Sequence, residues 1–135
     1  MIGDILYVMV AIIGFLFGGI YLFKKKCMPY HIQALDQDWN QIPIPIKTLC
    51  LALMRVAGGG YLSMAITISF FIGYNLNNNF SGNLILFSIG LAGTIPSVYA
   101  TLFVKKHTKG EPPTTLALTS ILLLVAAFIS STLHW

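Results

Sequence analysis

The sequence predicts an all-α protein, an integral membrane four-helix transmembrane bundle with a short cytoplasmic amphipathic segment between its first and second spans. Four apolar stretches are each long enough to cross a bilayer, which takes about 20 helical residues. Only 9% of the 135 residues are charged and 56% are hydrophobic, whereas a soluble domain carries roughly 25% charged residues. The composition therefore excludes a soluble domain.

The predicted spans share one transmembrane domain of residues 1–135. They cover about residues 2–23, 46–74, 84–104 and 114–134. The second stretch is longer than a bilayer needs, so we expect it to tilt or to extend past the hydrocarbon. Pro96 lies inside the third stretch and predicts a kink, because proline lacks the backbone donor that a helix uses there.

The segment of about residues 28–42 is the largest polar stretch, and its apolar residues recur at spacings of three and four. This stripe consists of Met28, Ile32, Leu35, Trp39 and Ile42. The spacing predicts an amphipathic helix lying along the lipid headgroups. Pro43 and Pro45 would close it, since proline disfavours helical backbone in the residue before it. An ordinary connecting loop is the alternative.

The basic residues predict the orientation. Seven of the eight Lys and Arg residues lie near the ends of spans, in the connections after the first and third stretches: Lys24, Lys25, Lys26, Lys47, Lys105, Lys106 and Lys109. The positive-inside bias places these connections in the cytoplasm and both termini outside. Cys27 and Cys50 then fall on the cytoplasmic side, where we expect reduced thiols.

The stretch from Leu53 to Leu62 holds the most unusual residues of any predicted span. Arg55 is costly in a membrane unless it snorkels outward, binds an anionic group, or finds a partner. We expect it to engage the third span near Tyr99 and Thr101, which lie at a similar depth. Three consecutive glycines follow and would let another helix approach closely: Gly58, Gly59 and Gly60.

The histidines were weighed as metal or catalytic residues. His31 follows Cys27 by four residues, and His107 lies on the same side of the membrane. A metal site needs three or four convergent ligands, so this set predicts no metal, and no cofactor or catalytic residue is predicted. No carboxylate lies deep in a predicted span, which disfavours a proton-coupled exporter.

Three short motifs stand out: Met28-Pro29-Tyr30-His31, the stretch from Leu53 to Leu62, and Ala100-Thr101-Leu102 with His107-Thr108. They resemble stretches of small, uncharacterised four-helix bacterial inner-membrane proteins. The resemblance implies a bacterial inner-membrane protein, in which outside termini would be periplasmic, and implies no particular activity. The expected partner is the lipid bilayer, and a nucleic-acid partner is not expected.

Three functions remain open at this stage. Small residues in every span favour a non-enzymatic protein that acts through helix packing, as a homo-oligomer or a subunit of a membrane complex. The alternative is a protein that binds or transports a lipid or small hydrophobic molecule, using Arg55 and a cleft opened by the glycines and Pro96. The third is a membrane enzyme of unknown type with Arg55, His31 or His107 in its site.

Overall fold

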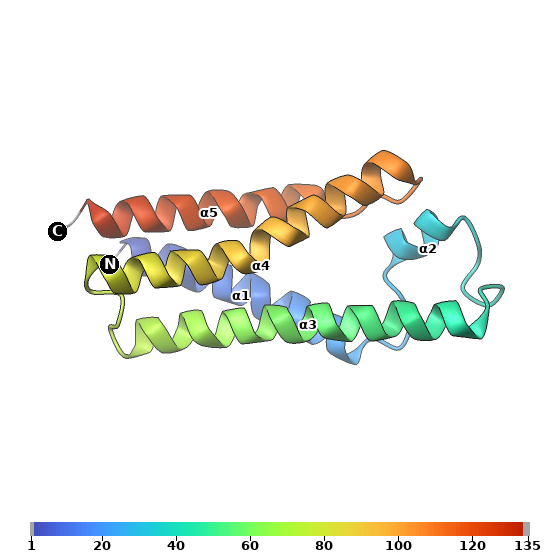
Figure 1. The fold of residues 1–135 in the computed structure, drawn as a ribbon, viewed down its shortest axis with the longest axis horizontal. Coiled ribbons are helices and arrows are strands. Elements are labelled where there is room, and N and C mark those ends of the chain that lie inside the picture. The colour runs from blue at the N-terminus through green and yellow to red at the C-terminus, as the bar shows by residue number, and fades with distance from the viewer. Residues whose placement is uncertain (1, 134–135) are drawn as a thin grey trace.

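The computed structural model describes residues 2–133, which form five α-helices and no strand (Figure 1). The helices are α1 (Ile2–Phe23), α2 (Pro29–Leu35), α3 (Ile44–Gly73), α4 (Phe80–His107) and α5 (Thr114–Thr132). All except α2 are long and apolar enough to span a membrane. The prediction of an all-helical chain with four such helices is confirmed.

The helix bounds differ from the predicted ones mainly in α4, which starts before residue 84 and continues past residue 104. Its start is set by Asn79, whose side-chain oxygen accepts a hydrogen bond from the Gly82 N–H at 2.7 Å. This contact satisfies one of the free donors at a helix N-terminus. α4 also continues through Pro96. The predicted end of the last span at residue 134 lies outside the described residues.

The prediction of an amphipathic helix over residues 28–42 was wrong beyond Leu35. Asp36 adopts a left-handed conformation with φ of 52°, and this ends α2. Aspartate is one of the few residues that tolerates such a backbone. The residues that follow form turns, in which Trp39 is half-buried and the Lys47 ammonium lies 5.5 Å from its ring centroid.

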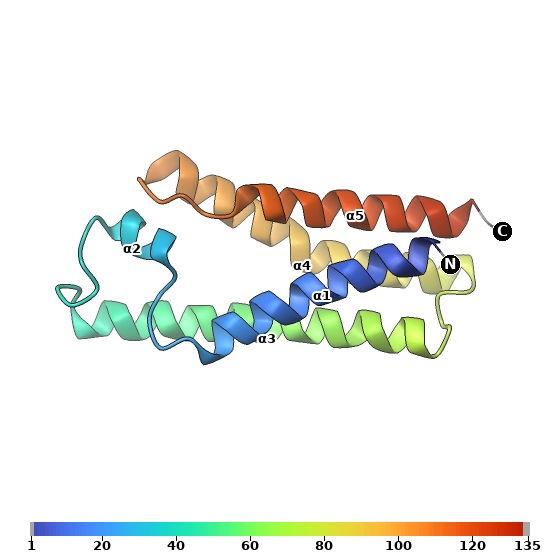
Figure 2. The ribbon, with the colours of Figure 1, turned by 180° about the vertical axis from the view of Figure 1, so that it is seen from behind.

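Helix α1 packs against both α3 and α5, and α5 packs against α4. The contact between α3 and α4 is less extensive than these three. Figure 2 shows α1 running diagonally across α3 and α5. The start of α1 and the end of α5 lie at the same end of the molecule as the α3–α4 connection, whereas α2 and the α4–α5 connection lie at the other (Figure 1). All the lysine-rich connections therefore share one end, which we call the α2 end.

Glycines set the close approach of α1 and α3. A Cβ at Gly58 would lie 2.9 Å from the Tyr21 Cβ and 3.0 Å from the Gly18 carbonyl oxygen. A Cβ at Gly59 or Gly60 would meet no atom within 4 Å. Only the first glycine of the triplet therefore packs closely on another helix in the described part of the chain, against Gly18 of α1.

A buried polar network joins α1, α4 and α5 at the end opposite α2. Tyr7 and Asn83 are both fully buried, and the Tyr7 hydroxyl donates to Asn83 Oδ1 at 2.8 Å. The Asn83 amide nitrogen in turn donates to the Phe128 carbonyl oxygen at 3.4 Å. Because buried polar groups are costly without partners, this network fixes how the three helices meet.

Candidate functional site

In its second half α4 turns away from α3 (Figure 1), and residues of both helices line a cleft between them. Pro96 lies within α4, and a proline ring inside a helix crowds the carbonyl four residues earlier and favours a bend. Three cavities lie along this cleft, with volumes of about 50, 430 and 570 Å³. The two larger volumes fall in the range typical of small-molecule sites.

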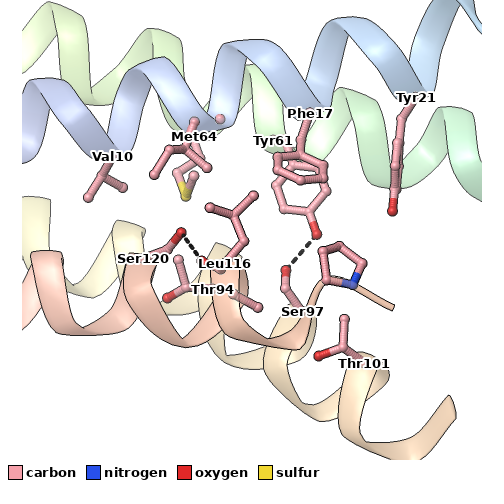
Figure 3. Close-up of a pocket in the computed structure, with 14 residues that line it drawn as sticks. Val10, Phe17, Tyr21, Tyr61, Met64, Thr94, Ser97, Thr101, Leu116 and Ser120 are labelled. Atoms are coloured by element: carbon pink, nitrogen blue, oxygen red, sulfur yellow. Dashed lines mark hydrogen bonds between the residues drawn. The ribbon is translucent and has the colours of Figure 1, made fainter. Parts of the chain in front are cut away.

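Tyr61 of α3 and Ser97 of α4 line all three cavities. Their hydroxyl oxygens are 2.6 Å apart, and Figure 3 shows this bond between the two helices. The Ser97 hydroxyl also donates to the Gly93 carbonyl at 2.7 Å. A serine hydroxyl has one hydrogen, so Tyr61 donates to Ser97, and this bond forms a polar bridge across the cleft.

The smallest cavity lies between α1, α3, α4 and α5 (Figure 3). Apolar side chains form part of its wall, among them Val10, Phe17 and Met64. Thr94 and Ser120 also line it, and each donates its hydroxyl hydrogen to a carbonyl of its own helix. Their oxygens keep acceptor capacity, so a cavity of about 50 Å³ can hold water or the end of a longer ligand.

The cavity of about 430 Å³ lies at the α2 end and combines polar and apolar walls. Its polar groups come from Tyr21, Tyr30, His31 and Thr101, and the Tyr21 and Tyr30 hydroxyls share a short hydrogen bond. Burial raises the pKa of Tyr30 and lowers the pKa of His31, since a dry site disfavours the charged form of each. The apolar walls come from Ala34, Leu35, Ile46, Leu49, Leu53, Met54, Ala57 and Ala100.

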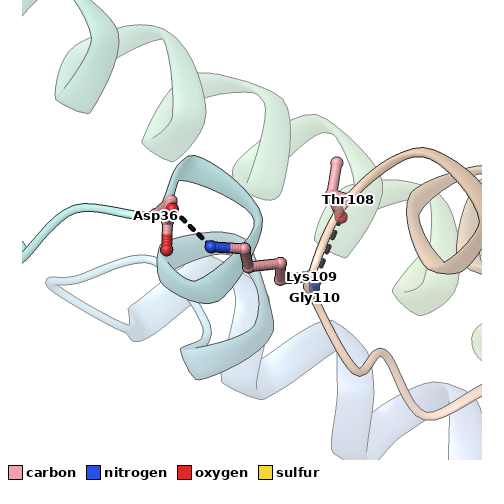
Figure 4. A network of polar contacts seen from close by, with 4 residues as sticks. All are labelled: Asp36, Thr108, Lys109 and Gly110. Atoms are coloured by element: carbon pink, nitrogen blue, oxygen red, sulfur yellow. Dashed lines mark hydrogen bonds and ion pairs between the residues drawn. The ribbon is translucent and has the colours of Figure 1, made fainter.

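Contacts with the α4–α5 connection hold α2 in place beside this cavity. The Lys109 ammonium lies 2.7 Å from an Asp36 carboxylate oxygen, and the Thr108 hydroxyl accepts from the Gly110 N–H at 3.1 Å (Figure 4). A Cβ at Gly110 would come within 2.6 Å of the Tyr30 carbonyl oxygen. The ion pair is exposed and contributes little by itself, so the close backbone approach is the stronger constraint.

The expected contact between Arg55 and Tyr99 is not formed. Arg55 is exposed and has no hydrogen bond or ion pair within residues 2–133. Tyr99 is 70% exposed and stacks on Phe103 with ring centroids 6.2 Å apart. Ala57 lines the cleft, and Arg55, two residues away, is rotated by about 200° around the helix. Arg55 therefore points away from the cleft.

The other predicted site residues do not share one site. Thr101, His31 and Gly60 line the cleft, although Gly60 lies in the largest cavity and the other two at the α2 end. Gly58 packs against α1, and Gly59 lines none of the three cavities.

His107 is exposed at the end of α4, where its Nδ1 lies 3.0 Å from the Phe103 carbonyl oxygen. Tyr61 and Ser97 were missed as site residues. Their positions in the sequence were the available signal, because Tyr61 directly follows the glycine triplet and Ser97 directly follows Pro96.

The expectation of two reduced cysteines was also wrong. Cys27 and Cys50 form a disulfide, with their Cα atoms 6.6 Å apart. The chain leaves α1 at Lys24 and turns back beside the first turns of α3, and this return brings the two residues together. The His31 Nδ1 lies 4.0 Å from the Cys50 sulfur.

Together these features define an all-helical protein with four helices long and apolar enough to cross a membrane, and with a partly polar cleft between two of them. No family model, curated protein or solved structure matches the chain. The cleft is mostly apolar along its length, with the Ser63 and Thr67 hydroxyls in its largest cavity and an imidazole at its α2 end. Such a lining suits a ligand that has a polar end and a hydrocarbon body.

Proposed function

We propose that the chain is an integral protein of the bacterial inner membrane and that its α3–α4 cleft binds a lipid or small hydrophobic molecule. Large apolar side chains on the outer faces of the long helices support membrane insertion; Val56, Leu16 and Leu122, for example, are 75%, 60% and 69% exposed. Water would disfavour such surfaces, whereas lipid accepts them.

The shared position of the lysine-rich connections supports the proposed orientation. The connections that follow α1 and α4 carry lysines and lie at the α2 end, while the start of α1 and the end of α5 lie at the other (Figure 1). With the α2 end in the cytoplasm, the chain follows the positive-inside bias and its termini are periplasmic.

Helix lengths support a position for the cleft relative to the bilayer. α1 and α5 have 22 and 19 residues, or about 33 and 28 Å, close to the ~30 Å hydrocarbon layer. α3 and α4 have 30 and 28 residues, or about 45 and 42 Å. Since α3 and α4 are joined at the periplasmic end, their extra length projects at the α2 end. The 430 Å³ cavity is then at headgroup depth.

The single observation that carries the proposal is a continuous, mostly apolar cleft whose α2 end adds a tyrosine hydroxyl and an imidazole from α2. A polar headgroup would lie among Tyr30, His31 and Thr101, and a hydrocarbon chain would extend past the Tyr61–Ser97 bridge into the 570 Å³ cavity. Ala57 and Ala100 line both cavities and are exposed. Small side chains at the rim would let a lipid enter sideways from the bilayer.

A second candidate function is helix packing, as a homo-oligomer or as a subunit of a membrane complex. The glycines that first suggested it are largely used inside the chain; a Cβ at Gly14, Gly18, Gly58, Gly90 or Gly93 would press on a neighbouring helix. Arg55 favours this candidate more, because it is exposed and has no partner in the described part of the chain. It lies about 27 Å along α3 from Gly73, near the cytoplasmic edge of the hydrocarbon, where an anionic headgroup or a partner protein could bind it.

The test of lipid binding is substitution of a rim alanine by tryptophan, which fills the cleft. In Ala57→Trp, the amount of lipid retained per chain after gentle detergent extraction, measured by native mass spectrometry, should fall roughly tenfold or more. Ala52→Trp is the matched control, since Ala52 is an exposed alanine of α3 that lines none of the three cavities. Equal lipid retention in the wild type and both variants would refute the proposal.

A further inference from the structure

Three metal-ligating side chains meet at the α2 end, outside the part of the cleft assigned to a hydrocarbon chain. Cys27 follows α1, His31 lies in α2, and Cys50 lies in α3. Their potential ligand atoms all lie within 4.8 Å of one another. Cys27 is 2% exposed, and the other two are half-buried. Residues from three separate segments of the chain thus converge in a largely dry place.

We propose that, once the Cys27–Cys50 disulfide is reduced, Cys27, His31 and Cys50 bind one thiophilic cation of the Zn²⁺ type. Two thiolates and one imidazole are a donor set that zinc accepts in tetrahedral geometry. The site does not depend on the proposed lipid binding, because its ligands would converge whether or not the cleft is filled.

The rearrangement that this site needs is small. At Zn–S distances of about 2.3 Å in a tetrahedral site, the two sulfurs stand about 3.8 Å apart, so they separate after the S–S bond breaks. The same geometry puts a sulfur and an imidazole nitrogen about 3.5 Å apart, and Cys50 Sγ and His31 Nδ1 are already 4.0 Å apart. His31 is held by its place in the first turn of α2, where its N–H donates to the Met28 carbonyl at 2.9 Å.

The charges of the site also favour a divalent cation. The two thiolates neutralise the two charges of Zn²⁺, so the occupied site adds no net positive charge beside Lys24, Lys25 and Lys26. Three protein ligands leave a fourth position open, as in catalytic zinc sites, whereas structural zinc sites are closed. His31 and Cys50 both line the 430 Å³ cavity, so the open position faces the cleft and can take water or the polar end of a ligand.

Metal binding takes two steps, which are reduction of the disulfide and replacement of the thiol protons by zinc. Breaking the disulfide takes two electrons and two protons and yields two thiols; a phosphine reductant supplies the electrons and becomes a phosphine oxide with an oxygen from water. Zinc then displaces the two thiol protons and itself undergoes no redox change. In the cytoplasm, the compartment proposed for this end, cellular dithiol systems can supply the electrons for this reduction.

The test uses the full chain in detergent after reduction by a phosphine. Zn²⁺ is titrated in competition with a chromophoric chelator, and Co²⁺ is added separately as a spectroscopic probe. The reduced wild type should bind one metal per chain and show thiolate-to-cobalt charge-transfer absorbance. Binding should weaken at least about 100-fold in Cys50→Ser and about 10- to 100-fold in His31→Ala, in line with the effects of disrupting metal sites. His107→Ala is the matched control, because His107 lies at the same end of the molecule and outside the cluster.

Two results would overturn the site. One is a reduced wild type that fails to take Zn²⁺ from the chelator, and the other is His31→Ala with the same affinity and cobalt spectrum as the wild type. The oxidised wild type is a further control, because no substitution can have misfolded it. With its disulfide intact it should not show the thiolate-to-cobalt band. Equal lipid retention in the wild type and Ala57→Trp, with metal binding intact, would refute lipid binding and leave this inference standing, so the two proposals can fail separately.

Discussion

The packing of α1 on α3 predicts sharply different effects for two neighbouring glycines. In Gly58→Ala, the new methyl group would lie 2.9 Å from the Tyr21 Cβ, 3.0 Å from the Gly18 carbonyl oxygen and 3.1 Å from the Leu22 backbone nitrogen. None of these atoms can move by a simple side-chain rotation. In Gly59→Ala, the methyl group would meet nothing within 4 Å.

The expected magnitude follows from the difference between the two variants. Replacing glycine by alanine inside a helix stabilises it by about 0.5–1 kcal/mol, and this contribution is common to both. Inserting a methyl group into a packed contact costs about 1–3 kcal/mol, and only Gly58→Ala incurs that cost. The free energy of unfolding should therefore be about 1–3 kcal/mol lower for Gly58→Ala than for Gly59→Ala.

The assay is equilibrium unfolding in mixed micelles of mild detergent and SDS, followed by circular dichroism, with wild type and both variants in the same buffer. The comparison needs no absolute stability, because the two substitutions are chemically identical and adjacent. Equal unfolding free energies, to within a few tenths of a kcal/mol, would refute the claim that α1 and α3 meet at Gly58.

Two further perturbations probe the other contacts that hold the fold. Tyr7→Phe should lower the free energy of unfolding by about 1–3 kcal/mol, because it leaves the fully buried Asn83 amide oxygen without its donor. Tyr74→Phe, at a tyrosine that is 69% exposed, should have almost no effect, and a similar loss in both variants would contradict the role of the buried network. Reducing the disulfide should lower the stability by about 3 kcal/mol, since it joins residues 23 apart in sequence. A double variant with both cysteines replaced by serine should not respond to reductant, and an identical response in the wild type would show that no disulfide had formed.

The fold could be predicted from the sequence to the level of helix number and order. Long apolar stretches and the lysines that flank them determine where spans start and stop, because charge is excluded from hydrocarbon. The glycine triplet correctly indicated a close helix contact, which Gly58 makes with α1. The rotation of each helix about its axis could not be predicted from the sequence, because core-facing and lipid-facing residues of a membrane helix are equally apolar.

Arg55 illustrates that limit for the candidate site. Arg55 and Tyr99 lie at similar depths in their predicted spans, and depth alone indicates Tyr99 as a partner. The direction in which Arg55 points depends on helix rotation, and the structure places it on the exposed side. The proximity of Cys27, His31 and Cys50 was equally hidden, because it depends on the short α2 turning back beside α3. The cleft itself depends on the course of α4 beyond Pro96, which the sequence indicated only as a kink.

Photolabelling tests the central claim, that the α3–α4 cleft receives a hydrophobic ligand, most directly. A phospholipid bearing a diazirine on its acyl chain would be incorporated into vesicles with the protein, activated by light, and its attachment sites mapped by peptide mass spectrometry. We predict saturable labelling of cleft residues such as Ala57, Tyr61 and Ala100, and its loss in Ala57→Trp. Non-saturable labelling spread over outward-facing residues such as Ile12 of α1 and Leu122 of α5, with none in the cleft, would contradict the account.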